Sequence, residues 1–414
     1  MAQDQPAEPS ASGTKQSETG NADPAQRPAV PERRGSAFLD FFSSLMGSKS
    51  PLAHAADPHR NTVWLLDNTA YQPVLDAPEQ GTSQSWQAEV VACIFETEGR
   101  EDVGQVIATI ADHSGIDGEY GGDQETREIM VQRLQPFLDR VSPARTVTLD
   151  VAVDGAKQTL PLGPSDRNGI ISQTVDLDAS RVIDGTVVHP RVRGFAGPAA
   201  TMETRFAGPE GWMVISDIDD TIKRTMTSEP TGILRTTFAE EPVPIAGMPE
   251  FYRHVQGELN PTWFYLSASP YNLYPFLHQF LHTYYCPGTL VLRDYSWMDI
   301  NGLIKSFTEK TQEYKVDRMQ KIRGWFPRRR VLCIGDSTQK DPEAYAEMYC
   351  RYPDWIHAIL IRKVTDVEHM EEKNRPERFA EAFKNVPAHV WTVFEDTKEL
   401  YDVVDKLGME DQAL

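Results

Sequence analysis

Short apolar runs alternate with stretches of helical periodicity through the second half of the chain, and this alternation constrains the fold most. The runs lie at 212–216, 262–266, 289–292, 330–334 and 357–361. Strands that alternate with helices form βαβ units, in which helices cover both faces of a parallel sheet. We therefore predict that residues 210–408 form an α/β domain around a parallel sheet.

A different pattern occupies residues 60–206, where apolar and polar residues alternate along several segments. The alternation is clearest at 147–153, where polar or small residues separate Val147, Leu149 and Val151. Other candidate strands lie at 62–66, 86–95, 170–177 and 186–192, and a candidate amphipathic helix lies at 130–141. A period of two is typical of half-buried antiparallel strands. The sequence therefore predicts a β-rich, sandwich-like domain with helical insertions ahead of the α/β domain.

The first 47 residues resemble neither of these patterns. Residues 1–35 are rich in Ala, Pro, Ser, Gln, Glu and Gly, and such a segment cannot bury enough apolar surface to offset the entropy of ordering, so we predict a disordered tail. Residues 36–47 are expected to form an amphipathic helix with Phe38, Phe42 and Leu45 on its apolar face. Two interpretations of this helix remain open, because it can lie in a membrane interface or dock on the protein's own core.

The composition excludes one large class of function. With 61 acidic and 41 basic residues the chain carries a formal net charge of -20, whereas proteins that bind nucleic acids need a basic face. We therefore expect no nucleic-acid partner. The four cysteines show no CxxC spacing and no run of about 18 apolar residues occurs, so we expect reduced thiols and a cytoplasmic protein without a membrane span.

Polar motifs follow three of the five apolar runs. They are SDIDDT at 216–221, SAS at 267–269 and GDSTQKD at 335–341. The carboxyl ends of parallel strands lie along one edge of a sheet, where open α/β sheets bind their ligands. We therefore expect these polar residues to converge on a single site.

The motif residues are suited to phosphoryl transfer. Asp217 can attack a phosphoryl group and form an aspartyl phosphate, while Asp219 can protonate the leaving oxygen and then activate water. The negative charge of carboxylate and phosphate must be offset, which a Mg²⁺ ion on oxygen ligands does, and Asp336 is the expected third ligand. Ser267 and Lys315 are the expected hydroxyl and ammonium donors to the phosphoryl oxygens.

The order of these motifs resembles that of a known enzyme superfamily. The segments ISDIDDTIK, FYLSASPYNLYPFL, EYK and IGDSTQKDPEAYAEMY are similar to those of haloacid dehalogenase-like phosphatases. More closely, they resemble the actin-patch phosphatidate phosphatase family of fungi, which has counterparts in bacteria. The resemblance implies a haloacid dehalogenase-like, Rossmannoid sheet. It also implies a Mg²⁺-dependent phosphatase that converts phosphatidate to diacylglycerol and phosphate through an aspartyl phosphate.

The resemblance further implies a role for each motif residue. The residues implied to hold Mg²⁺ are Asp217, Asp219 through its main-chain carbonyl, Asp336, and Asp341 as support or replacement for that ligand. The residues implied to act in catalysis are Asp217, Asp219, Thr221, Ser267 and Lys315. Of these, Thr221 and Ser267 would position the phosphoryl group. Asp220, the remaining acidic residue of the first motif, is expected to cap the following helix.

Partners and location follow from the same resemblance. It implies phosphatidate or a related anionic phospholipid as substrate, a peripheral position at membranes or actin patches, and cytoskeletal partners. The chain has no convincing cluster of P-x-x-P motifs to bind a cytoskeletal SH3 domain, which argues against the actin-patch association. The basic residues expected to meet an anionic headgroup are Lys223, Arg224, Arg235 and Arg293.

Two alternatives to the lipid phosphatase stay open at this point. The same chemistry can act on soluble phosphomonoesters or phosphoproteins, and the chain can also be a non-catalytic scaffold. A separate feature is the pair His278 and His282, whose spacing of four residues on a helix can hold zinc. The pair lacks the Glu of H-E-x-x-H and an evident third ligand, so we predict that these histidines belong to an amphipathic packing face.

Overall fold

The computed structural model describes residues 53–74, 85–97, 124–179, 181–294 and 310–412. The predicted tail at 1–35 and the predicted amphipathic helix at 36–47 lie outside these segments. The elements below all belong to one compact unit that spans residues 46–414. No helix in the described segments is long and apolar enough to cross a bilayer.

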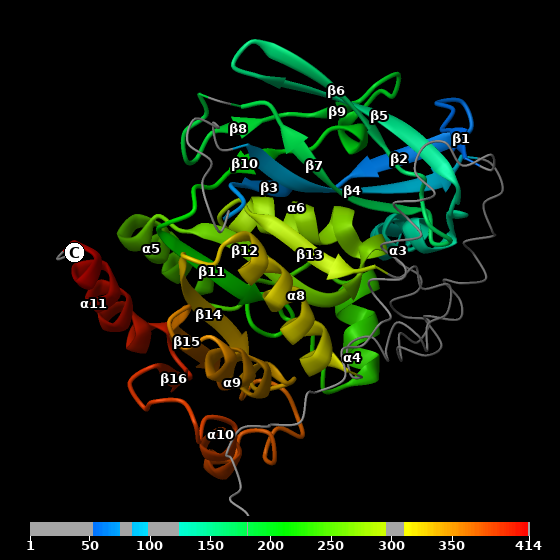
Figure 1. The fold of residues 1–414 in the computed structure, drawn as a ribbon. Helices are drawn as coiled ribbons and strands as arrows, with labels where there is room; N and C mark the ends of the chain where they lie inside the picture. The colour runs from blue at the N-terminus through cyan, green and yellow to red at the C-terminus, as the bar shows by residue number, and fades with distance from the viewer. Residues whose placement is uncertain (1–52, 75–84, 98–123, 180, 295–309, 413–414) are drawn as a thin grey trace, which may run out of the picture. The chain divides into compact units, whose positions relative to one another are not determined.

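A parallel sheet forms the second half of the chain, as predicted. In the described residues its six strands have the order β13-β12-β11-β14-β15-β16 (Figure 1). Their bounds are β11 Trp212–Asp217, β12 Thr262–Pro270, β13 Thr289–Arg293, β14 Arg330–Asp336, β15 Ile356–Arg362 and β16 Trp391–Phe394. Strand β16 was not predicted, because it is a short edge strand with mostly half-buried side chains and no continuous buried run. The α/β fold class is thus confirmed.

Helices cover both faces of this sheet because successive strand residues point to opposite sides. Val214 and Leu332 pack with α5, α6 and α11 on one face, whereas Met213 and Val331 pack with α8, α9 and α10 on the other. The helical segments are α4 Pro230–Leu234, π-helical η2 Arg235–Ala239, α5 Met248–Leu259, η3 Tyr271–Leu273, α6 Tyr274–Tyr284, α8 Thr311–Trp325, α9 Asp341–Arg351, α10 Pro376–Ala382, η4 Thr397–Leu400 and α11 Tyr401–Gln412.

The preceding region is rich in strands, and these strands form two sheets. One sheet has the order β1-β5-β6 with β9 paired to β5, and the other has the order β2-β4-β3-β10-β8 with β7 paired to β4. The bounds are β1 His54–Ala55, β2 Asn61–Leu65, β3 Asn68–Tyr71, β4 Trp86–Glu96, β5 Arg145–Val153, β6 Ala156–Leu162, β7 Ile170–Leu177, β8 Val187–Val188, β9 Arg191–Val192 and β10 Thr204–Phe206. Inward residues of both sheets share one hydrophobic cluster, as the alternating pattern indicates.

Two details of this region differ from the prediction or refine it. The single strand expected at 186–192 is two short strands, because Pro190 cannot donate to a ladder and the chain passes there from β8 in one sheet to β9 in the other. The predicted helix is α3, Gln124–Leu138, with Met130, Leu134 and Phe137 buried. A short helical turn, η1 Pro198–Ala200, completes the region.

The β-rich region and the parallel-sheet region share buried surface. Cys93 and Phe95 of β4 belong to the same hydrophobic cluster as Val214 of β11 and Leu277 of α6. The two regions therefore pack against each other through buried apolar side chains.

Candidate active site

Four charged residues from separate elements meet at the carboxyl edge of the parallel sheet. Asp217 ends β11 and Asp336 ends β14, and these two strands are neighbours. Asp341 begins α9, and Lys315 lies near the start of α8. Each of the four side chains is at most 1% exposed, so their charges must be compensated within the site.

The contacts among these residues form a compact network. The Lys315 Nζ donates to Asp217 Oδ1 at 2.7 Å and to the carboxylate of Asp341. The other Asp341 oxygen accepts the main-chain N–H of Asp336 at 3.1 Å. Carboxylate oxygens of the three aspartates lie within 4.8 Å of one another. The cluster therefore holds three carboxylates and one ammonium group, which contacts two of them, so a buried space carries excess negative charge.

The pKa values express this excess charge. Burial raises the pKa of Asp217 well above its ordinary value, although Lys315 opposes the shift. Burial, with Asp341 as the next cause, raises the pKa of Asp336 to about 7. For Lys315, burial alone would lower the pKa, but Asp217 and Asp341 outweigh it and hold the ammonium charged. A set of buried oxygen donors with uncompensated negative charge suits a hard divalent cation such as Mg²⁺.

Two threonines hold the carboxylates in place. The Thr221 Oγ1 lies 2.9 Å from Asp217 Oδ2 and 3.1 Å from Asp336 Oδ2, so its proton serves one of these two oxygens at a time. The main-chain N–H and the hydroxyl of Thr338 both donate to Asp336 Oδ1. Asp217 therefore has Lys315 on one oxygen and Thr221 on the other, which fixes the orientation of its carboxylate.

Asp219 has a separate environment from the three clustered aspartates. Its Oδ2 accepts from Ser267 at 2.6 Å and its Oδ1 accepts from Thr225 at 2.9 Å. The Lys223 Nζ lies 3.8 Å from the same Oδ1. Strand β12 runs on to Pro270, so Ser267 lies within the strand and not beyond its end. Two hydroxyl groups and a nearby ammonium thus hold the Asp219 side chain apart from the carboxylate cluster.

Two predictions about neighbouring residues are wrong. Asp220 does not cap the next helix, because the N-cap of α4 is Glu229; its carboxylate instead accepts the main-chain N–H groups of Thr225, Met226 and Thr227 at 2.7–2.8 Å. Lys223 cannot meet a lipid headgroup directly, because its side chain is 1% exposed.

The other basic residues proposed to meet a headgroup remain at least partly accessible. Arg224 is exposed, Arg235 forms an ion pair with Glu240, and the half-buried Arg293 guanidinium lies 4.9 Å from the centre of the Tyr314 ring. Arg224 is thus the most accessible of these cations, and it lies next to the first motif.

Two hydroxyl residues of the site were not predicted. Thr338 lies inside the third motif, and Thr225 lies a few residues after the first. Threonine near an aspartate is common in any sequence, so neither could be selected before the fold showed where the side chains point.

Comparisons with known proteins relate this site to a family. Residues 212–363 match the family model described as "Phosphatidate phosphatase APP1, catalytic domain". Phosphatidate phosphatase APP1 of Saccharomyces cerevisiae is 26% identical over 295 residues, which cover 68% of this chain and 49% of the yeast protein. An uncharacterized protein of Schizosaccharomyces pombe, C29B5.04c, is 31% identical over 159 residues, which cover 37% of this chain and 25% of that protein. The chain thus spans about half the length of these curated relatives, or less.

The match with a solved structure is much weaker. A chain from a carbohydrate esterase study overlaps 86% of this chain and 98% of its own length at 8% identity, with a TM-score of 0.19. That score does not indicate a shared fold. The family model, in contrast, covers every residue of the acidic site described above. Residues 212–363 of this chain, which carry the acidic site, are therefore similar to the catalytic domain of phosphatidate phosphatase APP1.

Proposed function

We propose that the chain is a Mg²⁺-dependent phosphatidate phosphatase with a haloacid dehalogenase-like catalytic domain, which hydrolyses phosphatidate to diacylglycerol and phosphate. The observation that carries this proposal is the buried cluster of Asp217, Asp336, Asp341 and Lys315 at the carboxyl edge of the sheet, inside the segment that matches the family. The name of the yeast relative supplies the substrate.

In this proposal Asp217 is the nucleophile. Its carboxylate oxygen attacks phosphorus, the ester bond to the diacylglycerol oxygen breaks, and an aspartyl phosphate forms. Lys315 and Thr221 contact the two oxygens of Asp217 and so orient the carboxylate before the attack. The ammonium of Lys315 also lies where it can offset charge on the transferring phosphoryl group.

Asp219 is the proposed acid and base. It gives a proton to the diacylglycerol oxygen as that oxygen leaves, and it then takes a proton from the water that attacks phosphorus and releases phosphate from Asp217. Ser267 and Thr225 each donate to one oxygen of Asp219 and hold its orientation. Ser267 is also proposed to turn toward the phosphoryl group when the substrate binds.

The metal would be held by the clustered carboxylates. Asp217, Asp336 and the main-chain carbonyl of Asp219 are the proposed ligands, with Asp341 as support or replacement. A bound Mg²⁺ would supply positive charge to the phosphoryl oxygens and to the carboxylates around them. The excess negative charge of the buried site supports this assignment.

The substrate would be reached at a membrane surface. We propose that the protein associates peripherally with anionic membranes and that Arg224 contacts the headgroup region. The cytoplasmic location and a cytoskeletal partner remain predictions that the described residues do not test.

The proposal is tested by measuring phosphate release from phosphatidate in mixed micelles and from a soluble phosphomonoester in parallel. The variants are Asp217→Asn and, as a matched control, Asp402→Asn at an exposed position of α11. We expect faster release from phosphatidate, its loss in Asp217→Asn or with chelator, and no effect of Asp402→Asn. Release from the soluble ester alone would support a phosphatase of the same chemistry and would refute the proposal that phosphatidate is the substrate. Release from neither substrate would favour a scaffold.

A further inference from the structure

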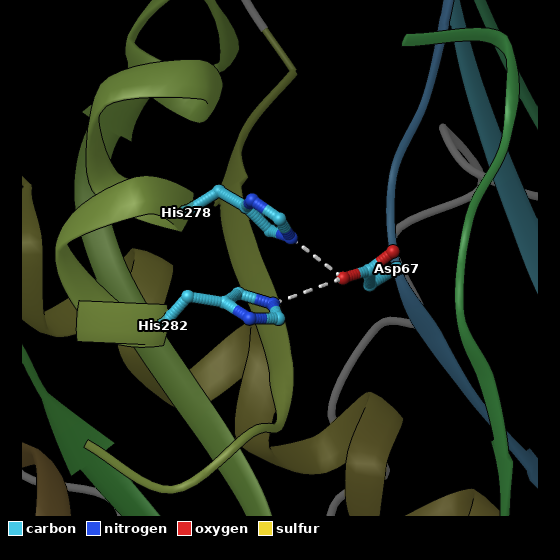
Figure 2. A group of neighbouring side chains, drawn as sticks. All are labelled: Asp67, His278 and His282. Carbon is cyan, nitrogen blue, oxygen red and sulfur yellow. Dashed lines mark hydrogen bonds and ion pairs between the residues drawn. The ribbon is translucent and has the colours of Figure 1, made fainter. Parts of the chain in front are cut away.

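A second group of candidate metal ligands, separate from the acidic cluster, joins two distant parts of the chain. His278 and His282 project from α6 toward Asp67, which lies between β2 and β3 (Figure 2). The His278 Nε2 is 2.7 Å from Asp67 Oδ2, and the His282 Nε2 is 3.9 Å from the same oxygen. The third ligand that the histidine pair lacks in the sequence is therefore present in the fold.

The Asp67 carboxylate is held so that one oxygen faces both histidines. Its Oδ1 accepts the main-chain N–H of Glu203 at 2.7 Å, which leaves Oδ2 for the imidazoles. Its own main-chain N–H donates to the hydroxyl of Tyr274 at 2.8 Å. Tyr274 belongs to the same helix as the histidines, and its ring centre lies 5.2 Å from that of His278. Hydrogen bonds to the other atoms of a ligand are the usual means of orienting it toward a metal.

A simple ion pair does not account for the whole arrangement. One histidine is enough to pair with Asp67 Oδ2, and His278 already makes a hydrogen bond of normal length with it. At 3.9 Å the His282 nitrogen is too far for a hydrogen bond, yet it points to the same oxygen, and the two imidazole centres are 4.3 Å apart. Two imidazoles directed at one carboxylate oxygen are arranged as ligands around a shared centre.

We propose that Asp67, His278 and His282 form a zinc site, with water as the fourth ligand. Two imidazole nitrogens and a carboxylate oxygen are a ligand set typical of zinc, whereas Mg²⁺ prefers oxygen ligands alone. Tetrahedral zinc with bonds of about 2.0–2.2 Å separates neighbouring ligand atoms by about 3.3 Å. The observed separations of 2.7 Å and 3.9 Å lie on either side of that value, so small side-chain rotations suffice.

The proposed ion would fasten the β-rich region to the parallel-sheet region. Asp67 follows β2 of the β-rich region, and α6 packs on the parallel sheet, so the three ligands bridge both. His278 is 36% exposed and His282 is 42% exposed, so zinc can reach the site without unfolding. This role is structural and does not depend on the proposed phosphatase activity.

The test is a titration of the chelator-stripped full chain with Zn²⁺ by isothermal titration calorimetry. Saturating Mg²⁺ is present throughout to occupy the acidic cluster, so that the measured heat comes from zinc binding at the histidine site. The variants are His278→Gln and His282→Gln. The matched control is His254→Gln, which removes a histidine at the same distance of 2.7 Å from an aspartate, Asp405, in a group with no second histidine.

We expect one zinc ion per wild-type chain and a loss of affinity of more than about 100-fold in either variant, because even groups behind the ligands change affinity 10- to 100-fold. The control should bind zinc as the wild type does. The His282→Gln variant best separates a zinc site from a simple contact between His278 and Asp67, because it retains the 2.7 Å contact and removes only the second imidazole. Equal zinc affinity in wild type and His282→Gln, or no binding by the wild type, would overturn the proposal. A visible spectrum of bound Co²⁺ checks the same variants independently of heat signals.

Discussion

Replacing Asp336 with asparagine should stabilise the metal-free protein while abolishing its activity. The Asp336 side chain is fully buried, and burial together with Asp341 raises its pKa to about 7 from an ordinary value of 3.8. Between these values the folded chain retains a proton that the unfolded chain has lost. The stability contributed by this proton is present at low pH and is lost as pH rises from about 4 to about 7.

The magnitude follows from the same two pKa values. Their difference corresponds to about 4 kcal/mol, at about 1.4 kcal/mol per pKa unit, and asparagine does not ionise. A weakened hydrogen bond from Thr221 or Thr338 offsets about 1 kcal/mol of this gain. We therefore expect Asp336→Asn to raise the free energy of unfolding by about 3 kcal/mol at pH 8 but by only about 1 kcal/mol at pH 5.5.

Urea unfolding in metal-free buffer at the two pH values measures this difference. Asp402→Asn, which removes an exposed carboxylate, is the matched control and should change little. Added Mg²⁺ should stabilise the wild type, by about 2.7 kcal/mol at 100 times its Kd, and should have much less effect on Asp336→Asn. If Asp336→Asn were less stable than the wild type at pH 8 without metal, the electrostatic reasoning would be refuted.

Three further variants test neighbouring residues. Lys315→Met leaves two buried carboxylates without their ammonium, so the free energy of unfolding should fall by about 3–5 kcal/mol in metal-free urea unfolding at pH 8; unchanged stability would mean that the carboxylates do not need this charge. Lys223→Met should lower kcat without changing sedimentation with anionic vesicles, because its side chain is 1% exposed; reduced vesicle binding would contradict that burial. Gly335→Ala should lower the free energy of unfolding by about 1–3 kcal/mol and remove most of the activity, because the added Cβ would lie 2.5 Å from the Asp341 carboxylate. In the control Gly324→Ala on α8, the added Cβ meets nothing within 4 Å. Equal stability of these two alanine variants would show that the site adjusts to the added methyl group.

The parallel sheet could be predicted because its central strands are buried on both faces. A strand such as β11, in which every residue is buried, must be apolar along its length until the chain reaches the site. Because of that requirement, the apolar run of β11 and the aspartate that ends it can both be recognised in the sequence. Strand β16 lies at the sheet edge and β8 and β9 are two residues each, so none of them leaves a comparable pattern.

Site residues that belong to a short sequence motif at a strand end could be predicted. Residues whose position depends on contacts formed only in the folded chain could not. Asp217 and Asp336 stand at strand ends that the sequence pattern locates. Asp67 is 211 residues from His278 in the chain, and no local pattern connects them. The burial of Lys223 was missed for the same reason, because its neighbours Thr225 and Asp219 turn it inward only once the loop is folded.

In the proposed mechanism, Asp217 carries the phosphoryl group of phosphatidate during turnover. The most direct measurement is rapid acid quenching of the Mg²⁺-loaded protein with phosphatidate, followed by peptide mass spectrometry of the segment that contains Asp217. We expect a phosphoryl group on Asp217 that forms and decays at rates compatible with phosphate release, and that is absent in Asp217→Asn. Phosphate release from phosphatidate without any phosphorylated Asp217, or with the group on another residue, would contradict it.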